Sequence, residues 1–465
     1  MQQLETDYLV VGSGAVGMAF VDTLLAESNY RVTIVDQHGA PGGHWNDAYS
    51  FVRLHQPSAY YGVNSKPLGK NSKDSFGINQ GMYERASAAE LLSYYEHAMA
   101  GFIATGRVQY FPMCNYLGDH QFQSVVSGAK HQVNVARKFV DTTYLKTSVP
   151  STHTLKYEVA AGVRVVPLNA LPKLKAAPAG YVVVGSGKTG MDACVWLLES
   201  GVNPDSIHWV MPRDAWYLNR LNVQPGEEFF EQSYGAFASQ AEAVAQADSV
   251  SDVFKRLEAA GQLLRFDESI EPTMYHGAVS SAAELAALRR IKNIVRMGHI
   301  QRIEPNQITL ANGVVRADPN WLYVDCSASA IILRPSIPVF SGNTITPQFI
   351  RTVQPTFSAA LTAYVEAHFE NEVEKNEICN PVPLPDKPID WLKMMFVNMA
   401  NQQRWGKEKE MKSWIAKSRL DGFTALALSV KPDDLPKQAI LQRFGKNAGP
   451  AVKKLYQFLN IEQAL

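Results

Sequence analysis

The stretch Asp7-Tyr-Leu-Val-Val11-Gly12-Ser-Gly14-Ala-Val-Gly17 decides the fold of this chain. Its first five residues are rich in β-forming side chains and predict a short buried strand. The glycines predict a tight turn, and residues 18–26 continue at helical spacing. Gly12 permits the sharp turn, Gly14 lets a pyrophosphate approach the backbone, and Gly17 lets the helix pack close to the strand. The order of strand, glycine turn and helix is typical of a dinucleotide-binding unit.

Two features around this loop support the interpretation. The start of the helix, including Ala15 and Val16, offers free N–H groups and a positive dipole end to phosphate. A second strand is expected over residues 31–35 and is followed by Asp36 and Gln37. The Asp36 carboxylate comes at the distance from the loop where a ribose hydroxyl is bound. The alternative is that the glycines serve only a tight turn.

A second loop repeats the pattern later in the chain. A strand is expected over residues 181–184, followed by Gly185-Ser-Gly187-Lys188-Thr189-Gly190 and a helix through Leu198. The Lys-Thr pair does not make this a P-loop, because that motif requires the spacing G-x-x-x-x-G-K-[ST]. The chain is therefore predicted to hold two dinucleotide sites.

The second site differs from the first at the end of its next strand. This strand, expected over residues 207–211, is followed by Pro212 and Arg213 instead of an acid. The missing carboxylate removes repulsion against a 2′-phosphate, and an arginine can pair with that group. We therefore expect the second site to prefer NADP. A solvated loop charge is the alternative role of Arg213.

The two loops, with Asp36 after the first, resemble flavoproteins that take hydride from a pyridine nucleotide. The stretch Gly42-Gly43-His44-Trp45 is similar to the G-G-x-W element of flavin-containing and Baeyer–Villiger monooxygenases, which runs beside the FAD. The segment around Asn64 resembles their T-N-x-P-K stretch, whose asparagine faces the flavin. Val63 replaces the threonine, and Lys66-Pro67 reverses the proline and lysine. The resemblance implies FAD in the first unit and NADPH in the second.

Three later segments belong to the same resemblance. The stretch His153-Thr-Leu-Lys-Tyr157 matches only the end of the family's F-x-G-x-x-x-H-x-x-x-[FWY] motif. Residues 324–328, which include Ser327, match the D-x-x-x-x-A-T-G strand without its threonine and glycine. A helix is expected from Pro355 to about His368, and in such flavoproteins this helix points its N-terminus at the isoalloxazine. The resemblance thus implies that Ser327 and Phe357 lie at a cofactor.

The activity implied by the resemblance is oxidation of a small organic substrate with O₂ through a reduced-flavin–oxygen adduct. Asn64 is the first candidate for holding that adduct, because an amide donates one hydrogen bond and accepts another. Arg53 is the second candidate, since its charge is suited to a developing negative charge. His55 is a weaker candidate. The alternatives are a turn cap for Asn64, a surface ion pair for Arg53 and a structural role for His55.

The composition excludes several other classes of protein. The 465 residues contain 44 basic and 44 acidic side chains, which argues against a nucleic-acid partner held by phosphate neutralisation. No run of about 18 apolar residues predicts a membrane span. The four cysteines lie far apart without a C-x-x-C pair, so dithiol chemistry and a metal site are not expected. Together with the absence of a signal-like N-terminus, this favours a cytoplasmic protein.

We therefore expect an α/β fold with two Rossmann-like dinucleotide-binding domains, for FAD and NADP, a helical insertion and a helical C-terminal extension. The FAD domain is expected over residues 1–176 and again over 319–370. The NADP domain is expected over 177–318, with the insertion at about 225–300, and the extension over 371–465. Capping-box motifs at Ser87–Glu90 and Ser281–Glu284 predict two helix starts.

Two other functions stay open at this point. One is an NADPH-dependent flavin reductase or oxidase that transfers electrons without inserting oxygen. The other is a non-catalytic nucleotide-binding protein that senses redox state. The sequence does not identify the substrate.

Overall fold

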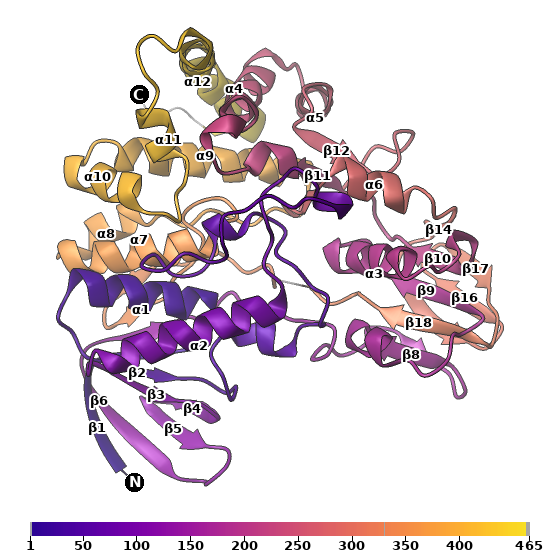
Figure 1. Ribbon diagram of the computed structural model, residues 1–465, viewed down its shortest axis with the longest axis horizontal. Helices are drawn as coiled ribbons and strands as arrows, with labels where there is room; N and C mark the ends of the chain where they lie inside the picture. Colours follow the sequence, from indigo (N-terminus) through magenta and orange to yellow (C-terminus); the bar gives the residue numbers. More distant parts are fainter. Residues whose placement is uncertain (1, 330, 462–465) are drawn as a thin grey trace.

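The computed structural model describes residues 2–329 and 331–461 (Figure 1). Two sheets lie side by side, one mainly and one wholly parallel, each with its own helices, and a layer of helices packs against both (Figure 1). The expected α/β fold with two Rossmann-like units is confirmed by the order and direction of the strands in these sheets.

The first sheet contains the parallel order β6-β1-β2-β3, built from β1 (Gln2–Val11), β2 (Val32–Val35), β3 (Val108–Phe111) and β6 (Lys130–Asp141). Strands β4 (Cys114–Gly118) and β5 (Gln121–Ser124) form an antiparallel hairpin on β6. Strand β1 begins five residues before the expected Asp7, because Gln2–Thr6 pair with residues 131–135 of the long β6.

Three helices cover the first sheet: α1 (Ala15–Glu27), α2 (Ala88–Ala104) and α7 (Pro355–His368). Helix α7 comes from late in the chain and packs against α1. Every residue of α7 from Thr356 to Glu366 is buried. The hairpin of β19 (Phe340–Ser341) and β20 (Thr344–Ile345) precedes α7 and joins the edge of the sheet on β6. The first unit is therefore assembled from two segments that lie far apart in the chain.

The second sheet has the order β14-β10-β9-β18-β8, and all of its pairs are parallel. Its strands are β8 (Arg164–Pro167), β9 (Gly180–Val184), β10 (Ile207–Val210), β14 (Asn293–Val295) and β18 (Trp321–Asp325), with α3 (Lys188–Glu199) after β9. A four-stranded sheet adjoins it, made of β7 (Glu158–Val159), β15 (Ile300–Glu304), β16 (Gln307–Leu310) and β17 (Gly313–Arg316).

These pairings move the boundaries of the second unit outward. Strand β18 lies beyond residue 318 and β8 lies before residue 177, yet β18 pairs with β9 and β8 pairs with β18 in the second sheet. The local sequence did not reveal this, because parallel partners far apart in the chain determine which sheet a short strand joins.

The helical insertion and the C-terminal extension form one layer (Figure 1). The insertion carries α4 (Phe230–Gln246), α5 (Val250–Ala259) and α6 (Ala282–Leu288), with a small sheet of β11 (Trp216–Asn219), β12 (Leu263–Arg265) and β13 (Val279–Ser280). The extension carries α8 (Glu372–Ile378), α9 (Pro388–Trp405), α10 (Lys409–Lys417), α11 (Thr424–Leu428) and α12 (Leu435–Leu459). Helix α12 packs along α4, and Trp391 of α9 lies 5.6 Å from the ring of Phe254.

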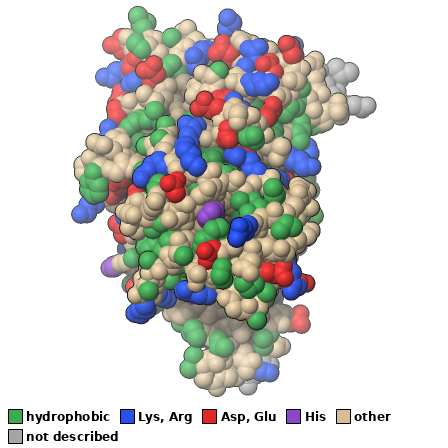
Figure 2. Space-filling view, turned by 90° about the vertical axis from the view of Figure 1, so that its right-hand side faces the viewer, with side chains coloured by type: hydrophobic (Ala, Val, Ile, Leu, Met, Phe, Trp, Pro, Cys, Tyr) green, Lys and Arg blue, Asp and Glu red, His purple; other side chains and the backbone are tan. Residues whose placement is uncertain are grey.

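The surface of the second unit carries both signs of charge. Figure 2 shows this face, on which lysine and arginine side chains are interspersed with aspartate and glutamate. Short 3₁₀ helices complete the described secondary structure, at Gly43–Asp47, Ser58–Tyr60, Gly77–Asn79, Leu168–Lys173, Pro204–Ser206, Arg220–Val223 and Glu227–Phe229. Among residues 2–329 and 331–461, no helix is long and apolar enough to cross a membrane.

Candidate functional site

The two glycine loops have the same backbone geometry. Gly12 and Gly185 occupy the left-handed region, with φ of 102° and 121°, which L side chains rarely adopt. A Cβ atom on Gly17 would lie 2.0 Å from the carbonyl oxygen of Gly12, and one on Gly190 would lie 2.1 Å from that of Gly185. Only glycine allows the helix to approach the strand this closely in each unit.

Both loops end in helix N-termini that no side chain caps. The N-cap residues are Gly14 for α1 and Gly187 for α3, and neither helix has an acid in its first turn. Helix α2, by contrast, is capped by Ser87 and Glu90. The first N–H groups of α1 and α3 have no intrahelical acceptor, since these groups lie in the first turn. These helix termini therefore fit the pyrophosphate of a dinucleotide.

The space around the two N-cap glycines differs. No atom lies within 4 Å of a Cβ built on Gly187, so that loop is open to a ligand. At Gly14 the backbone of Gly43 is in contact, and a Cβ on Gly43 would lie 2.8 Å from the Gly14 Cα atom. The Gly42–Trp45 element thus lies directly on the first glycine loop.

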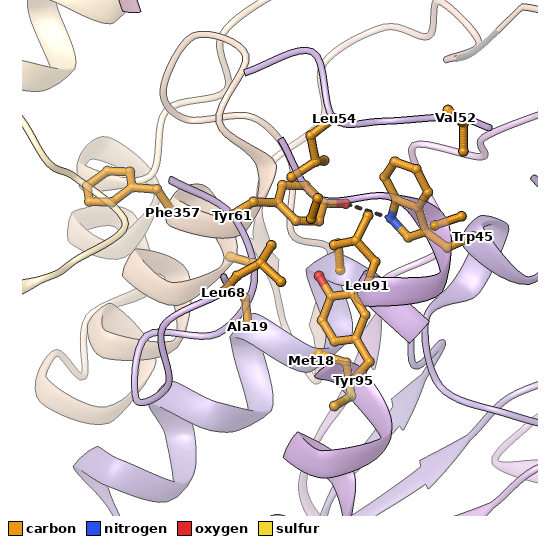
Figure 3. Close-up of a cluster of buried hydrophobic side chains, with 14 of the residues drawn as sticks. Met18, Ala19, Trp45, Val52, Leu54, Tyr61, Leu68, Leu91, Tyr95 and Phe357 are labelled. Atoms are coloured by element: carbon orange, nitrogen blue, oxygen red, sulfur yellow. Dashed lines mark hydrogen bonds between the residues drawn. The ribbon is translucent and has the colours of Figure 1, made fainter. Parts of the chain in front are cut away.

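Trp45, the last residue of that element, is buried in the core of the first unit. Trp45 Nε1 donates a hydrogen bond of 3.0 Å to the Tyr61 hydroxyl, in a cluster that also contains Tyr95 (Figure 3). Phe357, at the start of α7, lies on the other side of Tyr61 from Trp45 in this view. Burial lowers the pKa of His44 to about 4, so its imidazole is neutral at pH 7.

Asp36 accepts hydrogen bonds at both carboxylate oxygens. The Ser13 N–H and hydroxyl donate to Oδ2 at 2.5 and 2.8 Å, and the His38 N–H and ring donate to Oδ1 at 2.7 and 2.9 Å. These four donors fill the acceptor positions of a carboxylate. A ribose hydroxyl bound by Asp36 must replace one of them. Gln37, the next residue, is exposed.

His38 joins Asp36 to Asp47, whose Oδ2 lies 2.9 Å from His38 Nε2. The hydrogen bond with Asp36 raises the pKa of His38 to about 9, and Asp47 adds to the rise. Burial would raise the pKa of Asp36, but the bonds from His38 and Ser13 hold it below its usual range. At neutral pH an imidazolium therefore lies between two carboxylates.

The structure places the three candidate catalytic residues in different surroundings. The Ser418 hydroxyl donates to Asn64 Oδ1 at 2.9 Å, whereas Asn64 Nδ2 has no acceptor in the described part of the chain. The Arg53 side chain is 57% exposed and lies 4.0 Å from Glu90. Burial lowers the pKa of His55 to about 4, and the charge of Lys188 is the next cause.

Lys188, expected at the second cofactor, belongs to a buried ion network. Its ammonium pairs with Asp192 and, at 2.6 Å, with Glu284 Oε1. The other Glu284 oxygen accepts from Arg220 Nη2 at 2.7 Å, and the Tyr49 hydroxyl donates to Asp192 at 2.7 Å. Burial would raise the pKa of Glu284, but the charges of Lys188 and Arg220 hold it well below its usual range.

This network corrects the expectation of a second capping box. Ser281 does cap α6, because its hydroxyl accepts from the Glu284 N–H at 3.1 Å. The Glu284 side chain, however, points away from the helix start into the network. Sequence reasoning missed Glu284, Arg220 and Asp192 as site residues. The one signal was that Lys188 and Asp192 share a face of α3 at a spacing of four residues.

The remaining predicted site residues lie around the second sheet and the extension. Both terminal nitrogens of Arg213 donate to Asp386, at 2.8 and 3.1 Å, and His276 Nε2 lies 2.8 Å from the same carboxylate. Ser327 follows β18 beside the second glycine loop, with its hydroxyl donating to Asp325 at 2.7 Å. Thr189 is half-buried in the first turn of α3.

Neither metal nor disulfide chemistry is visible in the described part of the chain. Residues 2–329 and 331–461 contain no group of three or more metal-ligating side chains. All four cysteines are free and buried.

Comparison with known proteins gives a family match and close relatives. The model of the NAD(P)-binding Rossmann-like domain matches residues 10–64. Uncharacterized proteins of Mycobacterium tuberculosis H37Rv and Mycobacterium bovis are each 46% identical over 462 residues, which is 99% of this chain and 86% of the relatives.

Solved structures with some similarity include several monooxygenases and a bacillithiol disulfide reductase from Staphylococcus aureus, which has a TM-score of 0.47 and 10% identity over 80% of this chain and 100% of that one. A flavin monooxygenase variant from Stenotrophomonas maltophilia has a TM-score of 0.44 and 13% identity, over 79% of this chain and 99% of that one. A steroid monooxygenase bound to NADP has a TM-score of 0.48 and 13% identity, over 78% and 85%. Closed cyclohexanone monooxygenase has a TM-score of 0.46 and 12% identity, over 96% and 98%.

The first prediction tests the role of Glu284. Glutamine serves as well as glutamate in a capping box, but it cannot neutralise Lys188 and Arg220. We expect Glu284→Gln to lower the free energy of unfolding by about 3–5 kcal/mol, because it leaves buried charges without a partner. Glu90→Gln, in the true capping box, is the matched control and should change it by less than about 0.5 kcal/mol. Urea denaturation measures both variants. If Glu284→Gln and Glu90→Gln lower the free energy of unfolding by the same small amount, Glu284 has only a capping role.

The second prediction concerns His38 and pH. A folded pKa of about 9 exceeds the unfolded value of about 6.5, so His38 stabilises the fold fully below about pH 6.5 and loses this effect as pH rises through 9. The stability difference between wild type and His38→Gln should therefore be large at pH 6 and shrink by pH 9.5. Urea denaturation at both pH values measures it, with the exposed His97→Gln as control. A difference that does not depend on pH contradicts the prediction.

Proposed function

We propose that this chain, which belongs to the same family as the mycobacterial proteins it matches, is an FAD- and NADPH-dependent oxidoreductase. The observation that carries the proposal is the pair of glycine loops with one shared geometry, each leading to an uncapped helix N-terminus. The first loop, at Gly14, is in contact with the Gly42–Trp45 element, which supports FAD binding at the first loop. The other is open at Gly187, which supports the pyridine nucleotide there.

The roles of the chain's own groups follow from this assignment. The N–H groups of Ala15, Val16 and Gly17 would hold the FAD pyrophosphate, and those of Lys188, Thr189 and Gly190 the NADPH pyrophosphate. Bound FAD supplies the redox chemistry, accepting hydride equivalents from NADPH and passing electrons to O₂. The buried side chains around Trp45 and Phe357 exclude water from that part of the first unit.

We further propose that the electrons serve to insert oxygen into a small organic substrate. The resemblance of the Gly42–Trp45 element to that of monooxygenases supports this, as does the free Asn64 amide nitrogen. A second candidate is an NADPH oxidase that reduces O₂ without insertion. The exposure of the Arg53 side chain favours the oxidase. Water screens an exposed charge, so Arg53 would stabilise a developing negative charge only weakly.

The proposal is tested by anaerobic reduction of the purified protein. We expect the protein to carry oxidised flavin and NADPH to bleach its absorbance. Gly187→Val should keep the flavin but lose most of the bleaching, since its side chain would occupy space that no protein atom fills. Gly445→Val is the matched control, because a Cβ there also meets nothing within 4 Å and lies on the distant α12.

Three outcomes separate the readings. If NADPH bleaches the flavin of the Gly445→Val control but not that of Gly187→Val, this supports NADPH binding at the second loop. A wild-type protein that holds flavin which NADPH does not bleach would favour a redox-sensing protein instead. The reaction is also run in air with each candidate substrate. If the amount of hydrogen peroxide formed equals the amount of NADPH consumed with every substrate, this would favour the oxidase over the monooxygenase.

A further prediction concerns the choice between NADPH and NADH. Arg213 is the candidate partner of the 2′-phosphate, but Asp386 now holds it and repels that phosphate. A charge-assisted bond contributes on the order of 1.5–3 kcal/mol, so Arg213→Ala should raise the Michaelis constant for NADPH at least tenfold more than that for NADH. Asp386→Asn should lower the constant for NADPH selectively, because it frees Arg213 and His276. Equal changes for both nucleotides in both variants would refute the role of Arg213.

A further inference from the structure

Arg85 is a buried arginine without an acidic partner. It is 8% exposed, and its Nη1 donates to the Leu54 carbonyl at 3.3 Å. Its Nε–H is buried and has no acceptor among the described residues. No carboxylate oxygen lies within 4.0 Å of its guanidinium in residues 2–329 and 331–461. A charge of this kind is costly to bury unless a partner binds beside it.

Arg220 of the second unit faces the same backbone segment. It is 0% exposed and donates from Nε to the His55 carbonyl at 3.0 Å, one residue after the carbonyl that Arg85 contacts. Its Nη2 binds Glu284, but its Nη1 is buried without an acceptor. Burial lowers the pKa of Arg85 to about 10, and the nearby charge of Arg220 is the next cause. Two guanidiniums with unused N–H groups thus bind neighbouring carbonyls of one backbone segment.

The chain itself holds this pair in place. Gln224 Nε2 donates to the Arg220 carbonyl at 2.9 Å, and its Oε1 accepts from the Tyr83 N–H at 2.8 Å. The segment that carries Arg85 is therefore tied to the segment that carries Arg220. Gln224 is fully buried, so this link does not compete with water. The geometry is that of a built site rather than of two surface side chains.

The charges around the pair do not balance. Lys188, Arg220 and Arg85 contribute three positive charges, and Asp192 and Glu284 contribute two negative ones. The Glu284 carboxylate is already shared by Lys188 and Arg220. His55 adds no charge, because burial lowers its pKa to about 4. One buried positive charge is left over, which a single monoanion would neutralise.

We propose that Arg85 and Arg220 bind the carboxylate group of the substrate. A planar carboxylate accepts two hydrogen bonds in the geometry that guanidinium groups offer. Its single charge matches the excess, whereas a phosphate dianion would leave a buried negative charge. The site lies where the first unit, through Leu54 and His55, meets the second unit through Arg220. That the carboxylate belongs to the substrate rests on the proposed oxidoreductase function; the binding of a carboxylate does not.

The test uses acetate as the probe and the protein as purified. Thermal unfolding is followed while sodium acetate replaces sodium chloride at constant ionic strength. We expect a saturable rise in melting temperature for wild type. Arg85→Gln should weaken acetate binding at least about tenfold, since it removes a charge-assisted contact. Arg316→Gln, which removes one exposed arginine of β17, is the control and should keep the wild-type response.

A second variant and a second ligand complete the design. Arg85→Lys keeps the positive charge but loses the paired N–H donors of the guanidinium. This variant is used if Arg85→Gln does not fold. It should also weaken acetate binding. NADP⁺ affinity should be the same in wild type and in the Arg85 variant.

Three other outcomes overturn the proposal. No saturable effect of acetate on wild type would mean that buried water satisfies the two arginines. A stronger effect of inorganic phosphate, or a loss of NADP⁺ affinity in the Arg85 variant, would assign the site to a nucleotide phosphate. Anaerobic flavin reduction is measured on the same preparation, so its failure with intact acetate binding would refute only the oxidoreductase function.

Discussion

One contact sets the arrangement of both units: a glycine in the helix lies against the carbonyl oxygen of the first glycine of the loop. The pairs are Gly17 with Gly12 and Gly190 with Gly185. In each unit a Cβ atom would come within about 2 Å of that oxygen, so no other residue permits the same approach. The contact fixes the direction of α1 and α3 against their strands. It therefore also fixes where their uncapped N–H groups point. The position of any anion bound to these groups is set by this contact.

The two units are joined by polar groups that are largely buried. Tyr49 of the first unit contacts Asp192 of the second, and Arg220 of the insertion contacts the backbone at His55. Buried hydrogen bonds of this kind add little net stability compared with apolar packing, but they are strongly directional. They allow one relative placement of the glycine loops, which is what transfer between two bound cofactors requires.

The sequence predicted what depends on neighbours in the chain. The glycine loops, the presence of a strand before each and the extent of α7 all follow from local patterns, and the structure agrees except for the earlier start of β1. Contacts between distant segments were not predictable. Lys188 and Glu284 are 96 residues apart, and Arg213 and Asp386 are 173 apart, so no spacing rule connects them. Glu284 also fitted a capping box, and that local pattern concealed its long-range role. The roles expected of Asn64, Arg53 and His55 remain predictions.

The burial of α7 has a consequence for synthesis of the chain. Helix α7 covers α1, yet about 330 residues separate the two, and the second unit lies between them in the sequence. During translation the apolar side of α1 stays uncovered until residue 368 has left the ribosome, while the inserted unit already has all of its strands by residue 325. The second unit can thus fold first, and the nascent first unit is the part that needs protection from aggregation.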